Sequence, residues 1–479
     1  MKKKGLLILL ILAVVAIMST CLFACNLSGD DGLSAYELAL QEGFEGSLSD
    51  WLDSLNGMSG EDGLSAYKLA VSQGYEGTLN EWLASLKGER GRDGASLSIQ
   101  DVYDTAVENG YQGDFLTFIK EFLNNQVKSD CYGVSQGLMS SVSISAQFQV
   151  TTQGYYGPTV KTAVSNGSGV IYKLDKSLGN AYIITNHHVI HYSAADEPDG
   201  ISANIKVYLY GKEYSDYAIE ATYIGSSSAY DIAVLKVEGS EVLKGSDAAA
   251  VNVRNSQTIT VGERVNAIGN AAGGGISVTE GILSVDSEII SVKDDDIVQS
   301  YRVMRVDAAI NSGNSGGGLF DSSGELIGIV NAKYNSEEIE NIGYAIPSNI
   351  AIGVADNIID TCDGTSKTAP SVFRLGIETA LSQSKAVYDE SSKTVRIKET
   401  VAVKAVTASG AADGKLTEGD ILLSVSLDTD VVTIDRVFTL SDALLNVREG
   451  DIVAVTVERG GESVTLQFTA EAQYFTAVK

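Results

Sequence analysis

The chain contains few of the residues that hold metals and disulfide frameworks. It has four cysteines, three histidines and four prolines in 479 residues. Four cysteines are too few for a disulfide scaffold, and none is paired with histidine at zinc-site spacing, so neither a metal nor another cofactor is expected. The hydrophobic content of 44% excludes a disordered chain, and 49 glycines indicate many turns. This length predicts about three domains.

Basic residues are also scarce. Lys and Arg total 34 against 62 Asp and Glu, and the net charge is −28. Such an acidic chain repels phosphate backbones, which excludes nucleic acid as an expected partner.

The first 25 residues have the pattern of an export signal. Lys2, Lys3 and Lys4 precede an uncharged, mostly aliphatic run that ends in Leu22-Phe23-Ala24-Cys25. This ending resembles a bacterial lipobox, which predicts a signal peptide over 1–25, a lipid on Cys25 and a protein held on the outer face of the cell membrane. An uncleaved membrane anchor of about twenty residues is the alternative, and it also places the rest of the chain outside.

Residues 26–130 contain a repeated unit. Leu33-Ser34-Ala35-Tyr36 recurs as Leu64-Ser65-Ala66-Tyr67, and the repeats predict three short helical modules. We interpret them as a spacer between the membrane and the next domain, with a binding role as the alternative.

From about residue 131 to 368, short β-rich runs alternate with Gly, Asn and Ser turns, which is typical of β-barrels. Three segments stand out in this stretch. His188 follows a buried strand, Asp231 begins another, and Ser315 lies among glycines in Gly313-Asn314-Ser315-Gly316-Gly317. Histidine, aspartate and serine in such contexts are the groups that acyl transfer requires.

Each of these residue types has a distinct chemical task. Imidazole titrates near neutrality and can remove the serine proton, and a buried carboxylate fixes the imidazole tautomer. Glycines beside the serine allow a tight loop whose N–H groups bind an oxyanion.

At these residues the sequence resembles the HtrA/Deg family of serine proteases. Thr185–Val189, Asp231–Val237, Asp307–Leu319 and Ile342–Ser348 match signatures of that family. The resemblance implies a mainly β fold, with a chymotrypsin-like double β-barrel protease domain over 131–368. It also implies that Ser315 is the nucleophile, His188 the general base and Asp231 the orienting acid, with the N–H groups of Gly313 and Ser315 forming the oxyanion hole.

The sequence also indicates the character of the primary specificity pocket. In this fold the pocket floor lies about six residues before the serine, and no acidic residue is found there. We therefore expect preference for small or medium aliphatic side chains, and not for Lys or Arg. The residues predicted to line the pocket are Ala309, Ile310, Val330, Asn331 and Ala332.

Residues 369–479 resemble a PDZ domain. Leu375, Gly376 and Ile377 match its carboxylate-binding loop, whose N–H groups hold a peptide C-terminus while the peptide adds as a strand. Leu440, Ala443 and Leu444 are predicted to face the groove. A β-rich domain that binds no peptide is the alternative.

The resemblance implies an extracytoplasmic, membrane-anchored endopeptidase that degrades unfolded or misfolded proteins and assembles as a homotrimer. A surface binding or chaperone-like protein with an inactive protease fold remains the alternative. Cys131 and Cys362 lie at the two ends of the protease domain. They could form a disulfide, which would persist outside the cytoplasm, or remain two free buried thiols.

Overall fold

The computed structural model describes residues 131–213, 215–294, 297–332, 342–390 and 392–479, together with Tyr103, Val107 and Phe115. The predicted signal peptide, Cys25 and the helical repeats lie outside these residues. Contacts divide the chain into one unit over Met1–Phe118 and a second over Ile119–Lys479. No helix in the described ranges is both long enough and apolar enough to cross a bilayer.

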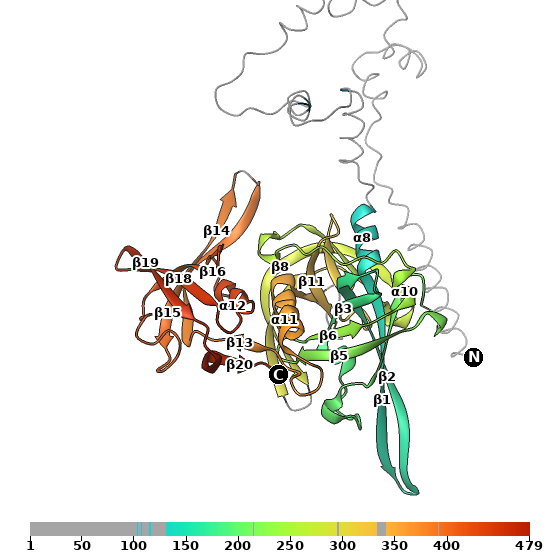
Figure 1. Cartoon of the computed structure of the whole chain (residues 1–479). Coiled ribbons are helices and arrows are strands. Elements are labelled where there is room, and N and C mark those ends of the chain that lie inside the picture. Colours follow the sequence, from blue (N-terminus) through green and yellow to red (C-terminus); the bar gives the residue numbers. More distant parts are fainter. Residues whose placement is uncertain are drawn as a thin grey trace, which may run out of the picture. The chain divides into compact units, whose positions relative to one another are not determined.

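The first part of the second unit is a closed antiparallel barrel with the strand order β1-β2-β3-β6-β5-β4. Alternating side chains of β1, including Val142, Ile144, Ala146 and Phe148, fill its interior and are at most 1% exposed. β1 and β2 continue far beyond this barrel as a hairpin (Figure 1). The six strands are β1 (Ser141–Gly154), β2 (Gly157–Asp175), β3 (Asn180–Thr185), β4 (Asn204–Leu209), β5 (Ile219–Ser227) and β6 (Ile232–Val237).

A second closed barrel follows, in the order β10-β11-β12-β9-β8-β7. β11 is a run of fully buried residues and therefore lacks the polar alternation of a half-exposed strand. The predicted mainly β, double-barrel fold is confirmed. The strands are β7 (Arg264–Gly269), β8 (Ser277–Asp294), β9 (Ile297–Val306), β10 (Gly318–Asp321), β11 (Leu326–Asn331) and β12 (Gly343–Pro347).

Few helices accompany the barrels in the described residues. α11 buries Ile350, Val354 and Ile358, whose spacing of four residues places them on one face. The helices are α8 (Tyr132–Ser140), α9 (His187–Ile190), α10 (Glu241–Lys244), α11 (Ser348–Thr361) and α12 (Thr439–Leu444). The 3-10 turns are η1 (Pro198–Gly200), η2 (Ser215–Tyr217), η3 (Ser256–Thr258), η4 (Ala271–Gly273) and η5 (Ala472–Tyr474).

The last hundred residues form a separate sheet with its own core. Its order is β14-β15-β16-β18-β19, with β17 paired to β16, and β13 pairs with β20. β14 is an edge strand of this sheet. The strands are β13 (Ser371–Phe373), β14 (Ile377–Asp389), β15 (Thr394–Val406), β16 (Ile421–Leu427), β17 (Asp430–Thr433), β18 (Ile452–Arg459), β19 (Glu462–Thr469) and β20 (Phe475–Ala477).

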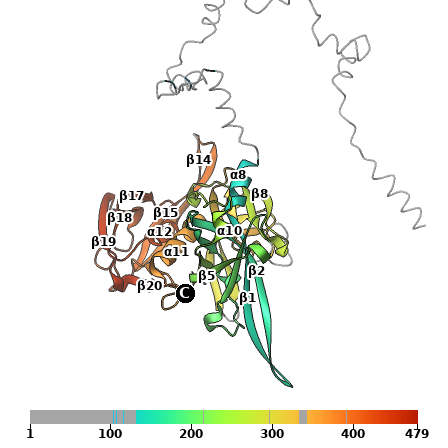
Figure 2. The ribbon, with the colours of Figure 1, turned by 45° about the vertical axis from the view of Figure 1, so that its right-hand side comes forward.

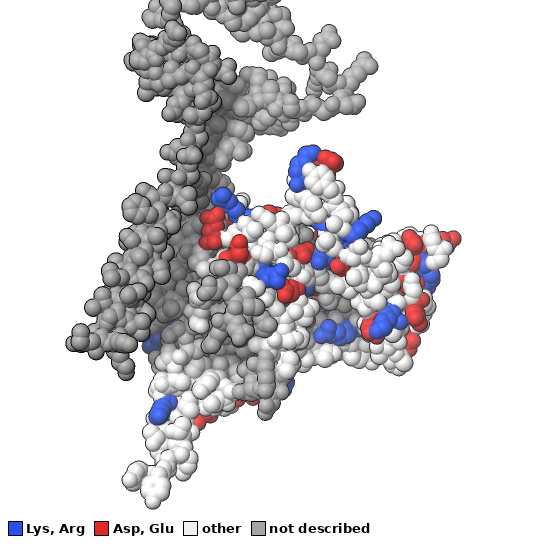
Figure 3. Space-filling model, turned by 180° about the vertical axis from the view of Figure 1, so that it is seen from behind, with Lys and Arg blue, Asp and Glu red and all other residues white. Residues whose placement is uncertain are grey.

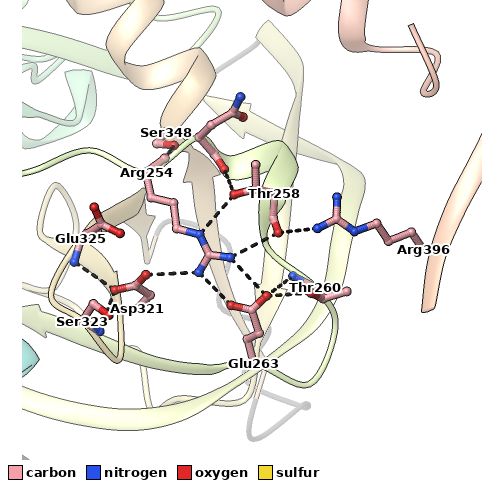
Figure 4. Close-up of polar contacts among 10 residues, drawn as sticks. Arg254, Thr258, Thr260, Glu263, Asp321, Ser323, Glu325, Ser348 and Arg396 are labelled. Carbon is pink, nitrogen blue, oxygen red and sulfur yellow. Dashed lines mark hydrogen bonds and ion pairs between the residues drawn. The ribbon is translucent and has the colours of Figure 1, made fainter. Parts of the chain in front are cut away.

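A polar network centred on Arg254 supports the second barrel (Figure 4). Its guanidinium donates to Glu263 at 2.8 Å and to Asp321 at 3.1 Å, and to Thr258 in η3. Arg396 of β15 donates to the carbonyl of the same Thr258, at 2.9 Å. The network thus joins the segment before β7 and the end of β10 to the C-terminal sheet.

A buried ion pair also joins the second barrel to the C-terminal sheet. Arg302 of β9 pairs with Asp442 of α12, and its guanidinium lies 3.8 Å from the centre of the Phe438 ring. Burial raises the pKa of Asp442 to about 6, and the nearby Arg302 only partly offsets this.

No disulfide joins Cys131 to Cys362 among the described residues, so the pairing that their positions left open is not formed. Cys131 immediately precedes α8, in which Gly133 lies against Ser322 of the β10–β11 turn. Cys362 instead follows α11 and lies against Gly225 of β5. The two thiols therefore lie in different surroundings.

Candidate active site

His188 lies on the short helix α9, directly after β3. Asn186 is extended and precedes the helix, while Val189 and Ile190 are buried in the first barrel core and anchor it. The His188 side chain is 19% exposed, and its Nδ1 lies 2.7 Å from Oδ2 of Asp231. The helix therefore presents the His188 imidazole at the barrel surface with one nitrogen already engaged.

Asp231 precedes β6 with φ of 51°, a left-handed conformation that Asp tolerates better than most residues. Its carboxylate accepts from His188 N at 3.0 Å, from His188 Nδ1 and from Asn331 Nδ2 at 2.8 Å. Asn186 donates to its carbonyl. Burial alone would raise the pKa of Asp231, but the charge and hydrogen bonds of His188 outweigh it and hold the pKa below its ordinary value.

Ser315 comes from the second barrel, in the loop between β9 and β10. Its carbonyl accepts from Ser168 N of β2 at 2.8 Å, which joins the two barrels at this point. Its Oγ accepts from Ala332 N at 3.2 Å. Among the described residues, no hydrogen bond joins Ser315 Oγ to the His188 ring. The hydroxyl is therefore directed toward the end of β11.

Asn331 and Ala332 bring the three predicted residues together. Asn331 bonds to Asp231, and the next residue bonds to Ser315. Asn331 is 1% exposed and also donates to Tyr301 Oη at 2.8 Å. The role of Asn331 beside the carboxylate was missed in the sequence, although a polar residue that ends a run of buried aliphatic residues signals a buried hydrogen-bond partner.

The loop before Ser315 has two free donors. Neither Gly313 N nor Ser315 N donates to another described residue, whereas the carbonyl of Ser312 is held by Ala272 N at 2.7 Å. Gly313 has φ of 97°, and a Cβ there would lie 2.1 Å from Asn270 O, so only glycine fits. Two N–H groups that bond to no described residue, next to a serine hydroxyl, are the donors that an oxyanion site requires.

The predicted pocket residues lie in different environments. Ala309 is exposed, while Ile310 and Ala332 are 7% and 8% exposed. Val330 has no exposed surface and packs in the second barrel core. Because Val330 is internal and Asn331 faces Asp231, these two residues do not form an open pocket wall as predicted.

The loop predicted to bind a carboxylate has the required donors. Gly376 has φ of 77°, and neither Leu375 N nor Gly376 N donates to a described residue. Ile377 begins the edge strand β14. Leu440 and Leu444, predicted to face the groove, are instead buried in the core of this domain. In the part of the chain that the structure describes, no cluster of three or more His, Cys, Asp or Glu side chains could hold a metal.

The chain is similar in sequence to known serine proteases. Residues 167–329 match the family described as "Trypsin-like peptidase domain". The "Serine protease Do-like HtrA" of Bacillus subtilis is 38% identical over 201 residues, which are 41% of this chain and 40% of that protein. A protein of the same name from Lactococcus lactis subsp. cremoris is 34% identical over 312 residues, 63% of this chain and 69% of that protein. A solved structure titled "HtrA-type protease AlgW with decapeptide" is 26% identical over 72% of this chain and 98% of that one, with a TM-score of 0.44.

Proposed function

Because this chain belongs to the HtrA family of serine proteases, we propose that it is an endopeptidase in which Ser315, His188 and Asp231 form the catalytic triad. The observation that carries this proposal is the part-buried His188–Asp231 hydrogen bond of 2.7 Å, which Asn331 and Ala332 link to the Ser315 hydroxyl.

The reaction follows from this arrangement. Ser315 Oγ turns toward His188, attacks the scissile carbonyl and gives its proton to Nε2, because Nδ1 already bonds to Asp231. Asp231 stays ionised, owing to its lowered pKa, and stabilises the imidazolium. The N–H groups of Gly313 and Ser315 bind the oxyanion. His188 then protonates the leaving amine, and a water molecule activated by the same imidazole hydrolyses the acyl-enzyme.

The direct test compares wild type with Ser315→Ala on an unfolded protein and on a short peptide. We expect cleavage of both by the wild type and of neither by the variant. A fluorophosphonate probe should label Ser315 in the wild type only. Activity retained by Ser315→Ala would contradict the assignment of the nucleophile.

One observation favours the alternative of a binding protein with an inactive protease fold. The Ser315 hydroxyl bonds to Ala332 N and not to His188 in this structure. Such bonds are often misaligned in enzymes without substrate, so we favour the protease. Absence of both cleavage and probe labelling in the wild type, with binding of unfolded polypeptide retained, would support the alternative.

We also propose that the C-terminal domain is a PDZ domain that binds peptide C-termini. Support comes from the N–H groups of Leu375 and Gly376, which donate to no described residue, and from the edge position of β14. Peptides with a free carboxylate should bind Ser315→Ala protein more tightly than the same peptides with an amidated end. Equal affinities would contradict a carboxylate loop.

The sequence pattern supports proposals about location and biological role. We propose that a lipid on Cys25 anchors the protein outside the cell membrane, where it degrades misfolded proteins as a homotrimer. Cys25→Ala should release the protein from the membrane fraction or block its processing, and an unchanged fraction would favour an uncleaved anchor. Sedimentation of the purified protein tests the trimer, and cleavage maps dominated by Lys or Arg would refute the aliphatic preference.

A further inference from the structure

The β1–β2 hairpin continues beyond the first barrel as a two-stranded ribbon. β1 pairs with β4 only from Val142 to Gln147, and β2 pairs with β3 only from Val170 onward. Residues 148–166, which we call the arm, therefore have no third strand beside them. Both ribbon views show the arm projecting from the barrel (Figures 1 and 2). A ribbon of two strands is marginally stable in water and leaves two backbone edges unpaired.

One edge of the arm is partly closed. Gln149 N donates to Glu197 at 3.1 Å, and Thr151 N donates to Asp196 at 3.1 Å. These N–H groups point away from β2, so Gln149 and its register partner Thr162 form a pair without hydrogen bonds between the two strands. The β1 edge near the barrel is thus capped by the segment that precedes η1.

The β2 edge is open. Because Thr162 points its N–H and C=O outward and strand residues alternate, the backbones of Val160, Val164 and Asn166 also point outward. No other strand pairs with this edge over residues 157–169 in the described part of the chain. Four consecutive outward positions therefore offer donors and acceptors to an added strand.

This open edge leads directly to the nucleophile. Ser168, the next outward residue, donates its N–H to the carbonyl of Ser315 at 2.8 Å. A Cβ on Gly273 would lie 3.8 Å from the Asn166 amide, which places Asn166 beside η4. In η4, Ala272 N holds the carbonyl of Ser312, next to Gly313. A polypeptide extended along the edge would therefore reach the bond that Ser315 attacks.

The side chains of the arm favour an uncharged partner. Val160 and Val164 are 60% and 53% exposed, and Tyr155 and Tyr156 at the tip are 98% and 100% exposed. Lys161 is the one charged residue between positions 141 and 167, in a chain with net charge −28. The arm is accordingly the mostly white projection at the bottom of Figure 3. Exposed β-branched and aromatic side chains pair best with the same residue types across strands.

We propose that the open edge of β2, residues 158–166, binds an extended, uncharged segment of the polypeptide substrate as a third strand of the arm. The proposal rests on the protease function proposed above. The proposed substrates of the arm are unfolded polypeptides, rich in β-branched and aromatic residues, that are long enough to reach from Ser315 to the arm. Continuity with Ser315 favours the substrate over a second copy of the chain as the occupant.

The test uses proline to remove one outward N–H group. Thr162→Pro deletes a donor on the open edge, at the kind of edge position where proline is tolerated. Gln153→Pro is the matched control, because it deletes an outward donor of the same arm on the β1 edge. Both variants are compared with wild type in kcat/KM on an unfolded protein such as casein and on a chromogenic tetrapeptide.

We expect Thr162→Pro to lower kcat/KM on the unfolded protein about fivefold, the net value of one hydrogen bond, and to leave tetrapeptide cleavage unchanged. Gln153→Pro should change neither. Val160→Asp alters an exposed side chain and no backbone group. It should also lower kcat/KM on the unfolded protein and leave cleavage of the tetrapeptide unchanged. Equal cleavage of the unfolded protein by wild type, Thr162→Pro and Val160→Asp would overturn the proposal.

Binding separates this inference from the proposed protease function. In a Ser315→Ala background, fluorescence anisotropy measures affinity for labelled casein without any cleavage. Thr162→Pro should weaken that affinity about fivefold even if the wild type proves inactive. Unchanged affinity, or a change in sedimentation that shows loss of a subunit contact, would overturn the assignment of the arm to substrate.

Discussion

Replacing Gly313 with alanine tests the oxyanion site through the backbone alone. Gly313 has φ of 97°, and a Cβ at this position would lie 2.1 Å from Asn270 O and 3.0 Å from Ala272 N. Both atoms belong to backbone, so they cannot move as freely as a side-chain end. The peptide of residue 313 must therefore rotate, and its N–H leaves the position that the proposed oxyanion site requires.

Two contributions set the size of the effect. An alanine held at this φ costs about 1–3 kcal/mol of backbone strain, most of which the loop relieves by rotating. Loss of one oxyanion donor lowers kcat by about 10²–10³ in comparable sites, or roughly 2.7–4 kcal/mol of barrier. We therefore expect Gly313→Ala to lower kcat on a short peptide at least a hundredfold, and to change the melting temperature only slightly.

Gly262→Ala is the matched control for backbone strain. Gly262 has φ of 94° and nothing lies within 4 Å of a Cβ built there, so the strain is similar and the clash is absent. This variant should keep kcat near that of wild type. If Gly313→Ala also kept kcat within about threefold of wild type, the N–H of Gly313 would not contribute to catalysis and the oxyanion site would be wrong.

Three further outcomes are expected. Ser315→Ala should abolish peptide hydrolysis and lower stability by no more than about 1 kcal/mol, the net value of the lost bond from Ala332 N, as activity and melting assays would show. Asn331→Ala should lower kcat roughly tenfold or more with KM unchanged, because Asp231 loses a charge-assisted donor; an unaltered kcat would contradict this positioning role. In the folded state Asp442 stays protonated up to about pH 6, whereas in the unfolded state it loses this proton near its ordinary pKa. The free energy of unfolding should therefore fall as pH rises between these two values. Asp442→Asn should lack this fall in denaturant titrations at pH 4 to 7, and parallel pH profiles of variant and wild type would refute it.

Local signals in the sequence were sufficient to predict the mainly β fold and to propose Ser315, His188 and Asp231 for the candidate site. The glycines around Ser315 indicate backbone conformations closed to other residues, and Gly313 and Gly316 indeed have φ of 97° and 83°. His188 and Asp231 each lie at the end of a strand of buried aliphatic residues, so their positions follow from strand boundaries. Such signals depend only on neighbours within a few residues, and they can therefore be recognised in a single sequence.

Contacts between distant segments required the tertiary structure. The bond from Asn331 to Asp231 spans a hundred positions and joins the two barrels, and nothing near Asn331 in the sequence specifies that partner. The separation of Cys131 from Cys362 likewise depends on which elements α8 and α11 pack against. The open edge of β2 is visible only once the ends of β3 and β4 are known, because an edge is defined by the strand that is missing. Sequence alone therefore determined the local chemistry and the fold class, whereas the register of strand pairing decided which of these groups meet.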